Sequence, residues 1–292
     1  MPTRVVVVGK SGQLASALAA TKLPFDAEIV FLGRADLPSQ EPSRLAEAID
    51  RHHPSLVINA AAFTAVDMAE QRIIEATALN TALPLLLAAY CRERQIAFIH
   101  VSTDYVFDGR KATPYREDDA LRPLNAYGRS KAAADLGICM TMPNASIIRT
   151  SWLFSATGNG FPQKIIAAAR KTGSVKVVND QIGRPTYAND LAEAVLEIAK
   201  HGLEGHPFVG GVINFANAGV VTWFDIARDI VDAVNMRDQS AVIVSPITSD
   251  ILNLQACRPA YSVLDTSLYE ERFKRPRHWD IPLHEILPGL LG

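Results

Sequence analysis

The sequence is poor in cysteine and has no surplus of charge of either sign. Its cysteines are only three in number and lie far apart in the chain (Cys91, Cys139 and Cys257). This pattern excludes a disulfide framework and a metal site of closely spaced thiolates, and it favours a reducing, cytoplasmic compartment. Lys and Arg number 29 against 31 Asp and Glu, a net charge of −2. Because the basic surplus of a duplex-DNA-binding protein is missing, we expect no nucleic-acid partner.

Long hydrophobic runs are missing as well. The longest, residues 82–90, contains Pro84 and is too short to cross a bilayer. Residues 1–9 lead directly into a valine series, without the longer apolar stretch and cleavage site of a signal peptide. We therefore expect a soluble chain with no membrane partner. Of its 292 residues, 48% are hydrophobic and 21% charged, an ordinary globular composition whose length favours two domains, or one with an appendage.

Short apolar strands and helical stretches alternate through the first half of the chain. The pattern predicts strands at residues 5–8, 29–32, 56–58, 97–101 and 146–148. It predicts helices after Gly12, at 43–51 with Ser43 as the cap, across 67–94, and at 127–140. This order predicts an α/β fold with a doubly wound parallel sheet of the Rossmann type.

The second half of the chain is less regular. Turn-rich segments separate apolar strands expected at residues 175–178, 212–215 and 241–244. We interpret residues 1–150 as a dinucleotide-binding domain and residues 151–292 mainly as a smaller substrate-binding domain. Some of the later strands are expected to return to the main sheet, so this boundary is approximate.

The first predicted strand ends in a glycine turn. Gly9 and Gly12, followed by Ala15, form a GxxGxxA pattern at the start of a helix. There the backbone can approach a pyrophosphate, and the N-terminus of the helix offers unpaired N–H groups. A glycine turn that closes any βα unit has the same appearance. The pattern alone therefore leaves dinucleotide binding and a purely structural turn equally open.

The end of the second predicted strand bears on the choice of cofactor. No acidic residue stands there to hold a ribose 2′-hydroxyl, and Arg34 follows closely. A guanidinium suits a 2′-phosphate, although a solvated loop arginine is an equally good interpretation. Asp36 could contact the adenine or the ribose. NADPH is favoured slightly, with NADH as the alternative.

The strongest local pattern is Tyr127 and Lys131, which share one face of a predicted helix. Such a pair is usually a surface pair, but Ser102, Thr103 and Asp104 end a predicted strand, where open α/β sheets bind their ligands. An ammonium at about 4 Å contributes on the order of 4 kcal/mol at an effective dielectric of about 20. That would lower the pKa of a phenol from about 10 to about 7. Thr103 would then hold a carbonyl oxygen, Tyr127 would protonate it, and Lys131 would lower the pKa of Tyr127 and hold a ribose.

With these residues, the chain resembles the extended short-chain dehydrogenases/reductases, and among them the dTDP-4-dehydrorhamnose reductase family. The resemblance spans Gly9 to about Asp265 and consists of several strings in one order. These are Gly9-Lys10-Ser11-Gly12-Gln13-Leu14, Asn59-Ala60-Ala61-Ala62-Phe63-Thr64-Ala65-Val66-Asp67, Ser102-Thr103-Asp104-Tyr105-Val106-Phe107, Pro123-Leu124-Asn125-Ala126-Tyr127-Gly128, Arg149-Thr150-Ser151-Trp152, Asn179-Asp180-Gln181 with Pro185-Thr186, and Arg258-Pro259 with Ser262.

The resemblance implies roles for individual residues. Thr103, Tyr127 and Lys131 would form the catalytic set. The cofactor would lie along Gly9, Gly12, Gln13, Leu14, Arg34, Asp36, Leu37, Ala60, Ala61, Ala62, Thr64 and Ser102, in addition to Tyr127 and Lys131. The sugar nucleotide would contact Asp104, Tyr105 and Trp152. Arg258, and more weakly Arg184, would bind the substrate diphosphate, although a structural ion pair is an equally good interpretation of Arg258.

The chain departs from the family pattern at a metal site. Some members of the family form a dimer around a magnesium ion held by glutamates, and here Ala17 and Asn189 stand at the corresponding positions. Because magnesium prefers carboxylate oxygens, we predict that no metal binds and that the chain is a monomer or a metal-independent homodimer.

Three functions remain open. The first is the reduction by NAD(P)H of the 4-keto group of dTDP-6-deoxy-L-lyxo-4-hexulose to give dTDP-L-rhamnose. The second is a reductase, dehydratase or epimerase for another nucleotide sugar. Dehydration is disfavoured because Asp104-Tyr105 stands where a 4,6-dehydratase has an Asp-Glu pair. The third is a non-catalytic subunit similar to the regulatory subunit of methionine adenosyltransferase, against which the intact Thr103, Tyr127 and Lys131 set argues.

Overall fold

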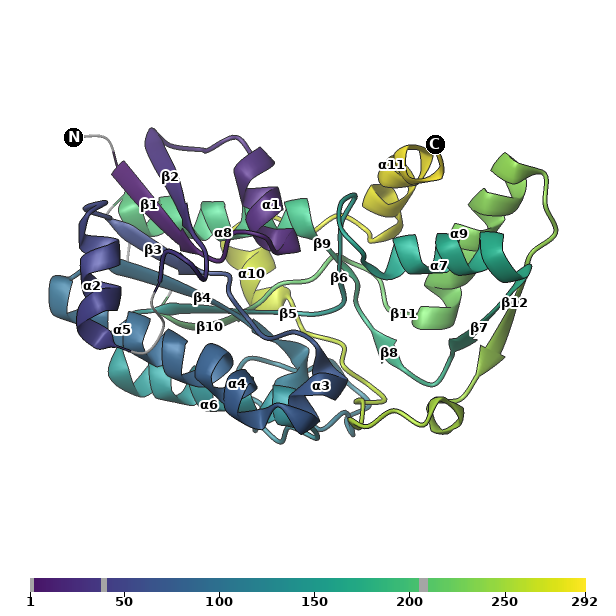
Figure 1. Ribbon diagram of the computed structural model, residues 1–292, viewed down its shortest axis with the longest axis horizontal. Coiled ribbons are helices and arrows are strands. Elements are labelled where there is room, and N and C mark those ends of the chain that lie inside the picture. Colours follow the sequence, from purple (N-terminus) through teal and green to yellow (C-terminus); the bar gives the residue numbers. More distant parts are fainter. Residues whose placement is uncertain (1–2, 38–40, 205–209) are drawn as a thin grey trace.

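A six-stranded parallel sheet forms the centre of the molecule (Figure 1). The computed structural model describes residues 3–37, 41–204 and 210–292. In the described residues the strand order is β10-β5-β4-β3-β1-β2, and every neighbouring pair is parallel. The strands are β1 (Thr3–Val8), β2 (Ala27–Leu32), β3 (Leu56–Asn59), β4 (Ala97–Thr103), β5 (Ser146–Thr150) and β10 (Gly211–Asn214). The predicted doubly wound α/β fold is confirmed.

Both faces of this sheet are covered by helices, which is why most residues of its strands are apolar. Alternate residues of β1 enter separate cores, Val5 and Val7 on one side and Val6 and Val8 on the other. The first core is closed by α1 (Gln13–Ala20) and α8 (Ala188–Leu203), together with Tyr269 of α10 (Ser267–Arg272). The second is closed by α2 (Pro42–Asp50), α5 (Leu83–Arg94) and α6 (Ala126–Thr141).

The sheet layers use residues from both halves of the sequence. Helix α8 packs on the face that α1 also covers, and β10 pairs with β5 at the edge of the sheet. These two elements come from beyond residue 150. The domain boundary at that residue stays a prediction.

The helical stretch predicted across residues 67–94 is confirmed, but it is not one continuous α-helix. The segment consists of α3 (Val66–Gln71), α4 (Ile73–Thr77), a π-helical turn η1 (Ala78–Ala82) and α5. Arg72 breaks the helix at φ −111° and ψ 48°. Within η1, the side chain of Asn80 bonds to the backbone N–H and C=O of Phe63 and to the hydroxyl of Ser130. These polar contacts across the molecule accompany the wider turn, and an apolar pattern does not encode them.

The start of α2 differs from the prediction. Ser43 is not the cap of α2, because the helix begins one residue earlier at Pro42, with Glu41 at the N-cap.

Residues 73–94 are long and apolar enough to cross a membrane on length and composition alone. Leu83, Leu87 and Ala88 of this segment pack into the core beneath the sheet, as expected of a helix inside a folded domain.

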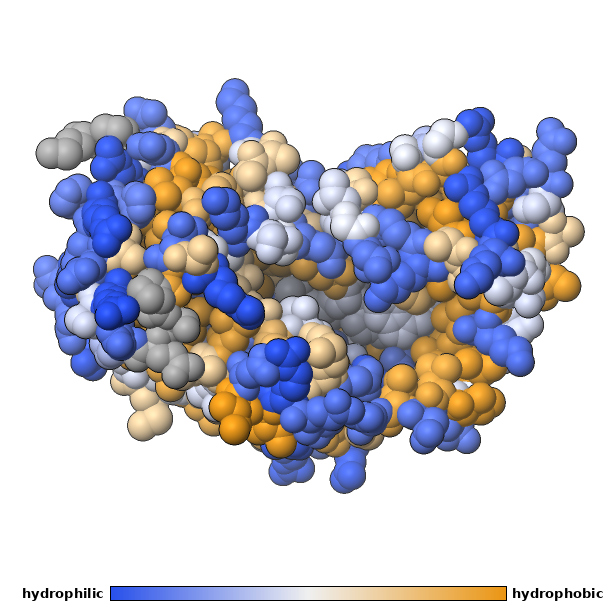
Figure 2. Space-filling view, viewed as in Figure 1, coloured by the Kyte–Doolittle hydropathy of each residue, from blue (hydrophilic) through white to orange (hydrophobic). Residues whose placement is uncertain are grey.

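The C-terminal part has its own core, lined by α7 (Phe161–Thr172), α9 (Trp223–Asp238) and α11 (Asp280–Leu291). Its short strands form two-stranded sheets: β7 (Ser174–Val178) with β12 (Ile243–Ile247), β6 (Leu153–Phe154) with β9 (Thr186–Tyr187), and β8 (Ile182–Gly183) with β11 (Val221–Thr222). The short helices η2 (Asp104–Val106) and η3 (Ser249–Leu252) complete the elements. The surface is hollowed between this part and the large sheet (Figure 2).

Candidate active site

The turn between β1 and α1 brings backbone close to backbone. Gly9 has φ +115°, and its N–H donates to the carbonyl of Leu32. A Cβ at this position would stand 2.9 Å from the nitrogen of Ala61, so only glycine fits. Gly12 is the N-cap of α1 and makes no side-chain capping bond, and a Cβ there would meet open space. The N-terminus of α1 is therefore an open site for an anion.

A cavity of about 610 Å³ opens beside this turn. Seven of the predicted cofactor residues line it: Gly9, Gly12, Arg34, Leu37, Ala60, Ala61 and Ala62. Sequence reasoning missed Lys10, which also lines the cavity. Its basic side chain and that of Arg34 suit phosphate groups, and Glu75, the acid among the lining residues, is ion-paired with Arg72. Size, backbone cradle and charge together fit a dinucleotide.

Other predicted cofactor residues lie outside the lining of this cavity. Leu14 is buried in the core under α1, and Asp36 accepts a hydrogen bond from the N–H of Gly33 at 2.8 Å. Gln13 begins α1, Thr64 is exposed, and Ser102 is buried near the end of β4. Their contact with a cofactor stays a prediction.

A second junction joins the end of β4 to the start of α6. The side chain of Asn125, the N-cap of α6, accepts from the N–H of Gly128 at 2.8 Å. A Cβ on Gly128 would overlap the carbonyl oxygen of Tyr105, so this glycine lets the first turn of α6 lie directly on η2. Tyr127 is thereby buried against Tyr105, ring edge to ring face at 5.7 Å. Close packing thus fixes where the phenol lies.

The predicted catalytic residues Thr103 and Tyr127 meet at this junction. Thr103 Oγ1 donates to Asp104 Oδ1 at 3.0 Å and accepts from the N–H of Tyr105 at 3.2 Å, and its side chain lies close enough to the phenol of Tyr127 to act on its pKa. Burial raises the pKa of Tyr127 to about 12, although Thr103 lowers it in part. Lys131 is not among the groups that act on this pKa, and the expectation that it lowers the pKa of Tyr127 to about 7 stays a prediction.

Lys131 makes its hydrogen bonds on the strand side of α6. Its Nζ donates to the carbonyl of Val101 at 2.7 Å and lies 3.0 Å from Nε2 of His100. The other ring nitrogen of His100 lies 3.0 Å from the amide nitrogen of Asn59. All three side chains are buried. Sequence reasoning did not single out His100 or the side chain of Asn59; alternation in β4 and the string that begins at Asn59 were the available signals.

Unpartnered oxygen atoms lie beside Thr103. Among the described residues, Asp104 Oδ2 and Ser102 Oγ are buried and have no hydrogen-bond partner. Burial raises the pKa of Asp104 to about 6. Because buried polar atoms are normally paired, these oxygens are suited to a polar ligand. The contact of Asp104 with a sugar hydroxyl stays a prediction.

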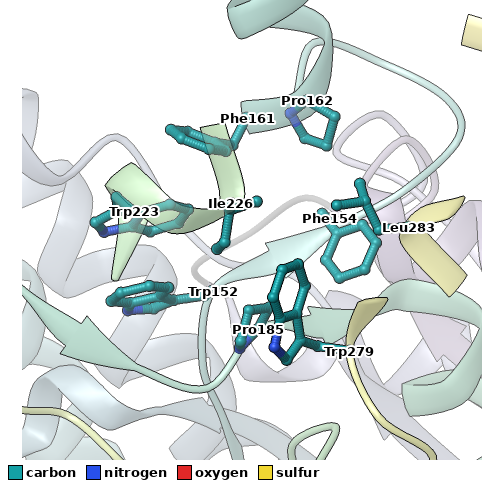
Figure 3. Close-up of a pocket in the computed structure, with 9 residues that line it drawn as sticks. All are labelled: Trp152, Phe154, Phe161, Pro162, Pro185, Trp223, Ile226, Trp279 and Leu283. Carbon is teal, nitrogen blue, oxygen red and sulfur yellow. The ribbon is translucent and has the colours of Figure 1, made fainter. Parts of the chain in front are cut away.

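Trp152 lies in an aromatic cluster of the C-terminal part (Figure 3). Its indole stacks on that of Trp223, with ring centroids 3.9 Å apart and planes at 10°. The cavity enclosed here is only about 10 Å³, and its lining is almost entirely apolar: Trp152, Phe154, Phe161, Pro162, Pro185, Trp223, Ile226, Trp279 and Leu283. One face of the Trp152 ring is thus occupied by Trp223, and contact with a sugar stays a prediction.

The two predicted diphosphate ligands both bond within the chain. Arg184 donates to the carbonyls of Asn217 and Leu264 and to Thr266 Oγ1, which are structural contacts. Arg258 forms an ion pair with Asp67 at 2.7 Å and joins its loop to α3. This is the structural alternative for Arg258. Binding of a diphosphate by either arginine stays a prediction.

Carboxylates are missing from the predicted dimer-metal positions. Ala17 is buried in the core where α1 meets α8, and Asn189 lies at the start of α8. Within residues 3–37, 41–204 and 210–292, no group of three His, Cys, Asp or Glu side chains is arranged to hold a metal ion. A metal-independent assembly stays a prediction.

Comparison with known proteins identifies the family. The model of a family described as RmlD substrate binding domain matches residues 3–291. The chain belongs to this family. The resemblance to dTDP-4-dehydrorhamnose reductases is therefore confirmed, and the RmlD family match covers both the large sheet and the C-terminal part.

Individual members of the RmlD family are similar over nearly their whole length. A probable dTDP-4,6-dihydroxy-2-methyloxan-3-one 4-ketoreductase of Streptomyces antibioticus is 35% identical, over 99% of this chain and 96% of that protein. A dTDP-4-dehydrorhamnose reductase of Aggregatibacter actinomycetemcomitans is 35% identical, over 97% of this chain and 98% of that protein. The crystal structure of dTDP-4-dehydrorhamnose reductase from Bacillus anthracis in complex with NADP has a TM-score of 0.90 at 28% identity, and covers 99% of this chain and 100% of that one.

Proposed function

We propose that this protein reduces the 4-keto group of dTDP-6-deoxy-L-lyxo-4-hexulose to give dTDP-L-rhamnose, with NADPH as cofactor and NADH as a weaker alternative. The observation that carries the proposal is the buried contact between Thr103 and Tyr127 at the end of β4, with Lys131 one turn further along α6. Membership of the RmlD family and the NADP complex of a similar protein support the same reaction.

The residues of this chain fit NADPH. Gly9, Gly12 and Ala60–Ala62 would hold the pyrophosphate and adenosine in the large cavity, and Arg34 would pair with the 2′-phosphate. When bound, NADPH supplies the hydride that reduces the carbonyl carbon. Everything else in the reaction depends on protein side chains.

The protein's task in the reaction is to deliver one proton. With a pKa of about 12, the phenol of Tyr127 keeps its proton at neutral pH and can donate it to the carbonyl oxygen as that oxygen gains negative charge. Thr103 lies beside the same phenol, and its hydroxyl, which donates to Asp104 in the structure, would turn to the phenolate that is left and stabilise it. Asp104 Oδ2, unpartnered among the described residues, would accept from a hydroxyl of the sugar.

The test is NADPH consumption, followed by absorbance, with the 4-keto sugar as substrate. Tyr127→Phe should reduce turnover by roughly two to four orders of magnitude, the usual contribution of a positioned proton donor. Tyr90→Phe is the matched control, because Tyr90 lies in α5 and bonds to Asp50 away from the site. A wild type without turnover, or a fully active Tyr127→Phe, would rule the proposal out.

A related 4-keto sugar is the second candidate substrate. The two relatives of equal identity carry names for different dTDP sugars. Both 4-keto substrates should therefore be offered to the enzyme, and the ratio of their kcat/KM values decides between them. Arg34→Ala tests the cofactor in the same assay: we expect preference for NADPH over NADH to fall, and an unchanged ratio would remove Arg34 from the cofactor site.

The compartment and the oligomeric state of the enzyme are also part of the proposal. We propose a cytoplasmic enzyme that acts as a monomer or as a homodimer without a bridging metal. The mass in solution, measured by light scattering with and without EDTA, should not change. A dimer that dissociates in EDTA would contradict it.

A further inference from the structure

A chain of three buried polar side chains links the central sheet to α6. It runs from Asn59 at the end of β3, through His100 in β4, to Lys131 in α6. Each of the two links measures 3.0 Å, and none of the three side chains is more than 1% exposed. The family resemblance implies a role for Lys131, whereas the other two side chains have no assigned role.

The orientation of the Asn59 amide determines the tautomer of His100. The Oδ1 atom of Asn59 accepts from the N–H of Ala61 at 3.1 Å, so the Nδ2 group is the one that faces His100. An amide NH₂ only donates, and the Nδ1 atom of His100 must therefore accept. A neutral imidazole carries one hydrogen, which then lies on Nε2.

The Nε2 hydrogen of His100 points at Lys131. An ammonium has three hydrogens and no acceptor, so a charged Lys131 would place hydrogen against hydrogen at 3.0 Å. A neutral amine has a lone pair that accepts from Nε2–H while one of its hydrogens still goes to the carbonyl of Val101. Counting donors and acceptors thus favours the uncharged amine.

We infer that Asn59 and His100 are positioning residues that set the charge of Lys131, by holding its side chain as a neutral hydrogen-bond acceptor. To become a cation, the amine takes one proton from solvent and gives up its bond to Nε2–H. If Lys131 holds the cofactor ribose as a cation, which rests on the proposed function, NADPH binding is coupled to proton uptake at alkaline pH.

The surroundings agree with this assignment. Burial lowers the pKa of Lys131 to about 8 and takes that of His100 well below its ordinary value. Asp135 opposes the shift at Lys131, but it is itself ion-paired with Arg149 at 2.9 Å. Titratable groups on the elements around Lys131 are His100 of β4, Arg149 of β5, Asp104 and Tyr105 of η2, and Tyr127, Arg129, Asp135 and Cys139 of α6. Of these, His100 bonds to Lys131 and Asp135 acts on its pKa.

Calorimetry of NADPH binding in buffers of different ionisation enthalpy measures the proton uptake. At pH 9 we expect about one proton taken up per NADPH bound, falling towards zero near pH 6.5, since the amine is then charged beforehand. Asn59→Asp keeps the acceptor for Ala61 but presents an oxygen to Nδ1. The His100 hydrogen then moves to Nδ1, Nε2 accepts from a charged Lys131, and uptake at pH 9 should disappear.

Asn214→Asp is the matched control for burying a new carboxylate. Asn214 is buried at the end of β10, as Asn59 is at the end of β3, and bonds to the carbonyl of Tyr115. It should keep the wild-type uptake. Wild type that binds NADPH without uptake, or Asn59→Asp with unchanged uptake, overturns the inference.

The imidazole ¹⁵N shifts give a second measurement that needs no cofactor and no variant of Asn59. We expect the Nε2–H tautomer for His100 in the wild type, with its signal identified by its loss in His100→Phe. The Nδ1–H tautomer would overturn the inference whatever NADPH does. Failure of NADPH to bind at all would instead count against the proposed function.

Discussion

The β1–α1 turn and the β4–α6 junction lie at the same edge of one sheet, but backbone groups form the first and side chains form the second. The first is backbone: Gly9 has a conformation only glycine tolerates, and the N-terminus of α1 stands open beside a large cavity. The second is side chain: Thr103, Tyr127 and Lys131 are buried and bonded to their neighbours. One junction is shaped to receive a ligand, and the other holds reactive groups in place.

The largest expected effect comes from breaking a buried ion pair between β5 and α6, the helix that carries Tyr127 and Lys131. Arg149 and Asp135 form an ion pair whose side chains are 3% and 1% exposed. Arg149→Met leaves Asp135 buried without its counter-charge, which should lower the free energy of unfolding by about 3–5 kcal/mol in urea titrations.

The more exposed pair Arg170–Asp238 is the control for this variant. Arg170→Met should cost less than about 1 kcal/mol, because water screens that pair. Equal losses in the two variants would mean that burial does not make the Arg149–Asp135 pair more important for stability than the exposed pair.

The next effect is a gain in stability, at Asp104. Burial raises its folded pKa to about 6 from 3.8, so the native state binds protons more tightly and its stability falls as pH rises between these values. The penalty is complete above pH 6. Asp104→Asn should therefore raise the free energy of unfolding by up to about 3 kcal/mol at pH 8, and by nothing below pH 4.

Unfolding curves at pH 4 and pH 8 check this sign. Activity of the same variant should fall, because the carboxylate proposed to bind the sugar is gone. A variant that is less stable than wild type at pH 8 would show that burial of the ionised Asp104 carboxylate does not destabilise the folded state.

The same contrast explains what the sequence could predict. Gly9, Gly12 and the valines of β1 act through local rules, so the fold followed from their spacing, whereas Ala60–Ala62 in the lining of the large cavity were predicted from the family resemblance. The partners of Lys131 and Arg258 come from β4 and α3, 31 and 191 residues away. The residue types indicated the chemistry of these side chains but not their hydrogen-bond partners. The pKa of Tyr127 depends on burial, which no local sequence pattern reveals.

The first junction is tested by its glycines. Gly9→Ala must adopt φ +115° and brings a Cβ against Ala61, which should cost about 2 kcal/mol of stability and weaken NADPH binding. Gly12→Ala has room and an ordinary φ of −82°, so stability should hold while affinity falls, because the added methyl points into space proposed for the pyrophosphate.

Thermal unfolding and NADPH titration separate these two effects. Gly289→Ala in α11, where a Cβ also meets open space, controls for the added methyl: it should leave NADPH affinity unchanged and raise stability by about 0.5–1 kcal/mol, because alanine favours the helix over glycine. Unaltered affinity in both Gly9→Ala and Gly12→Ala would remove the dinucleotide from this turn.

The smallest effect concerns Arg258. Its guanidinium is ion-paired with Asp67 in the structure, but it is also predicted to bind the substrate diphosphate. Although burial opposes it, the hydrogen bonds from Arg258 and from the N–H of Ala256 keep the pKa of Asp67 below its ordinary value. The pair thus contributes stability above the unfolded pKa of Asp67, lost as pH falls through the folded one. Arg258→Met and Asp67→Asn should each cost about 1 kcal/mol at pH 7, and the double variant little more than either.

Kinetics on these variants decides whether Arg258 also binds the substrate. If the arginine serves only the ion pair, both single variants should change KM for the sugar nucleotide equally. If it contacts the diphosphate, Arg258→Met should raise KM by roughly tenfold more than Asp67→Asn does, because it alone removes a charged hydrogen bond of about 1.5 kcal/mol. Equal changes in KM would mean that Arg258 only joins its loop to α3, and that the diphosphate binds elsewhere.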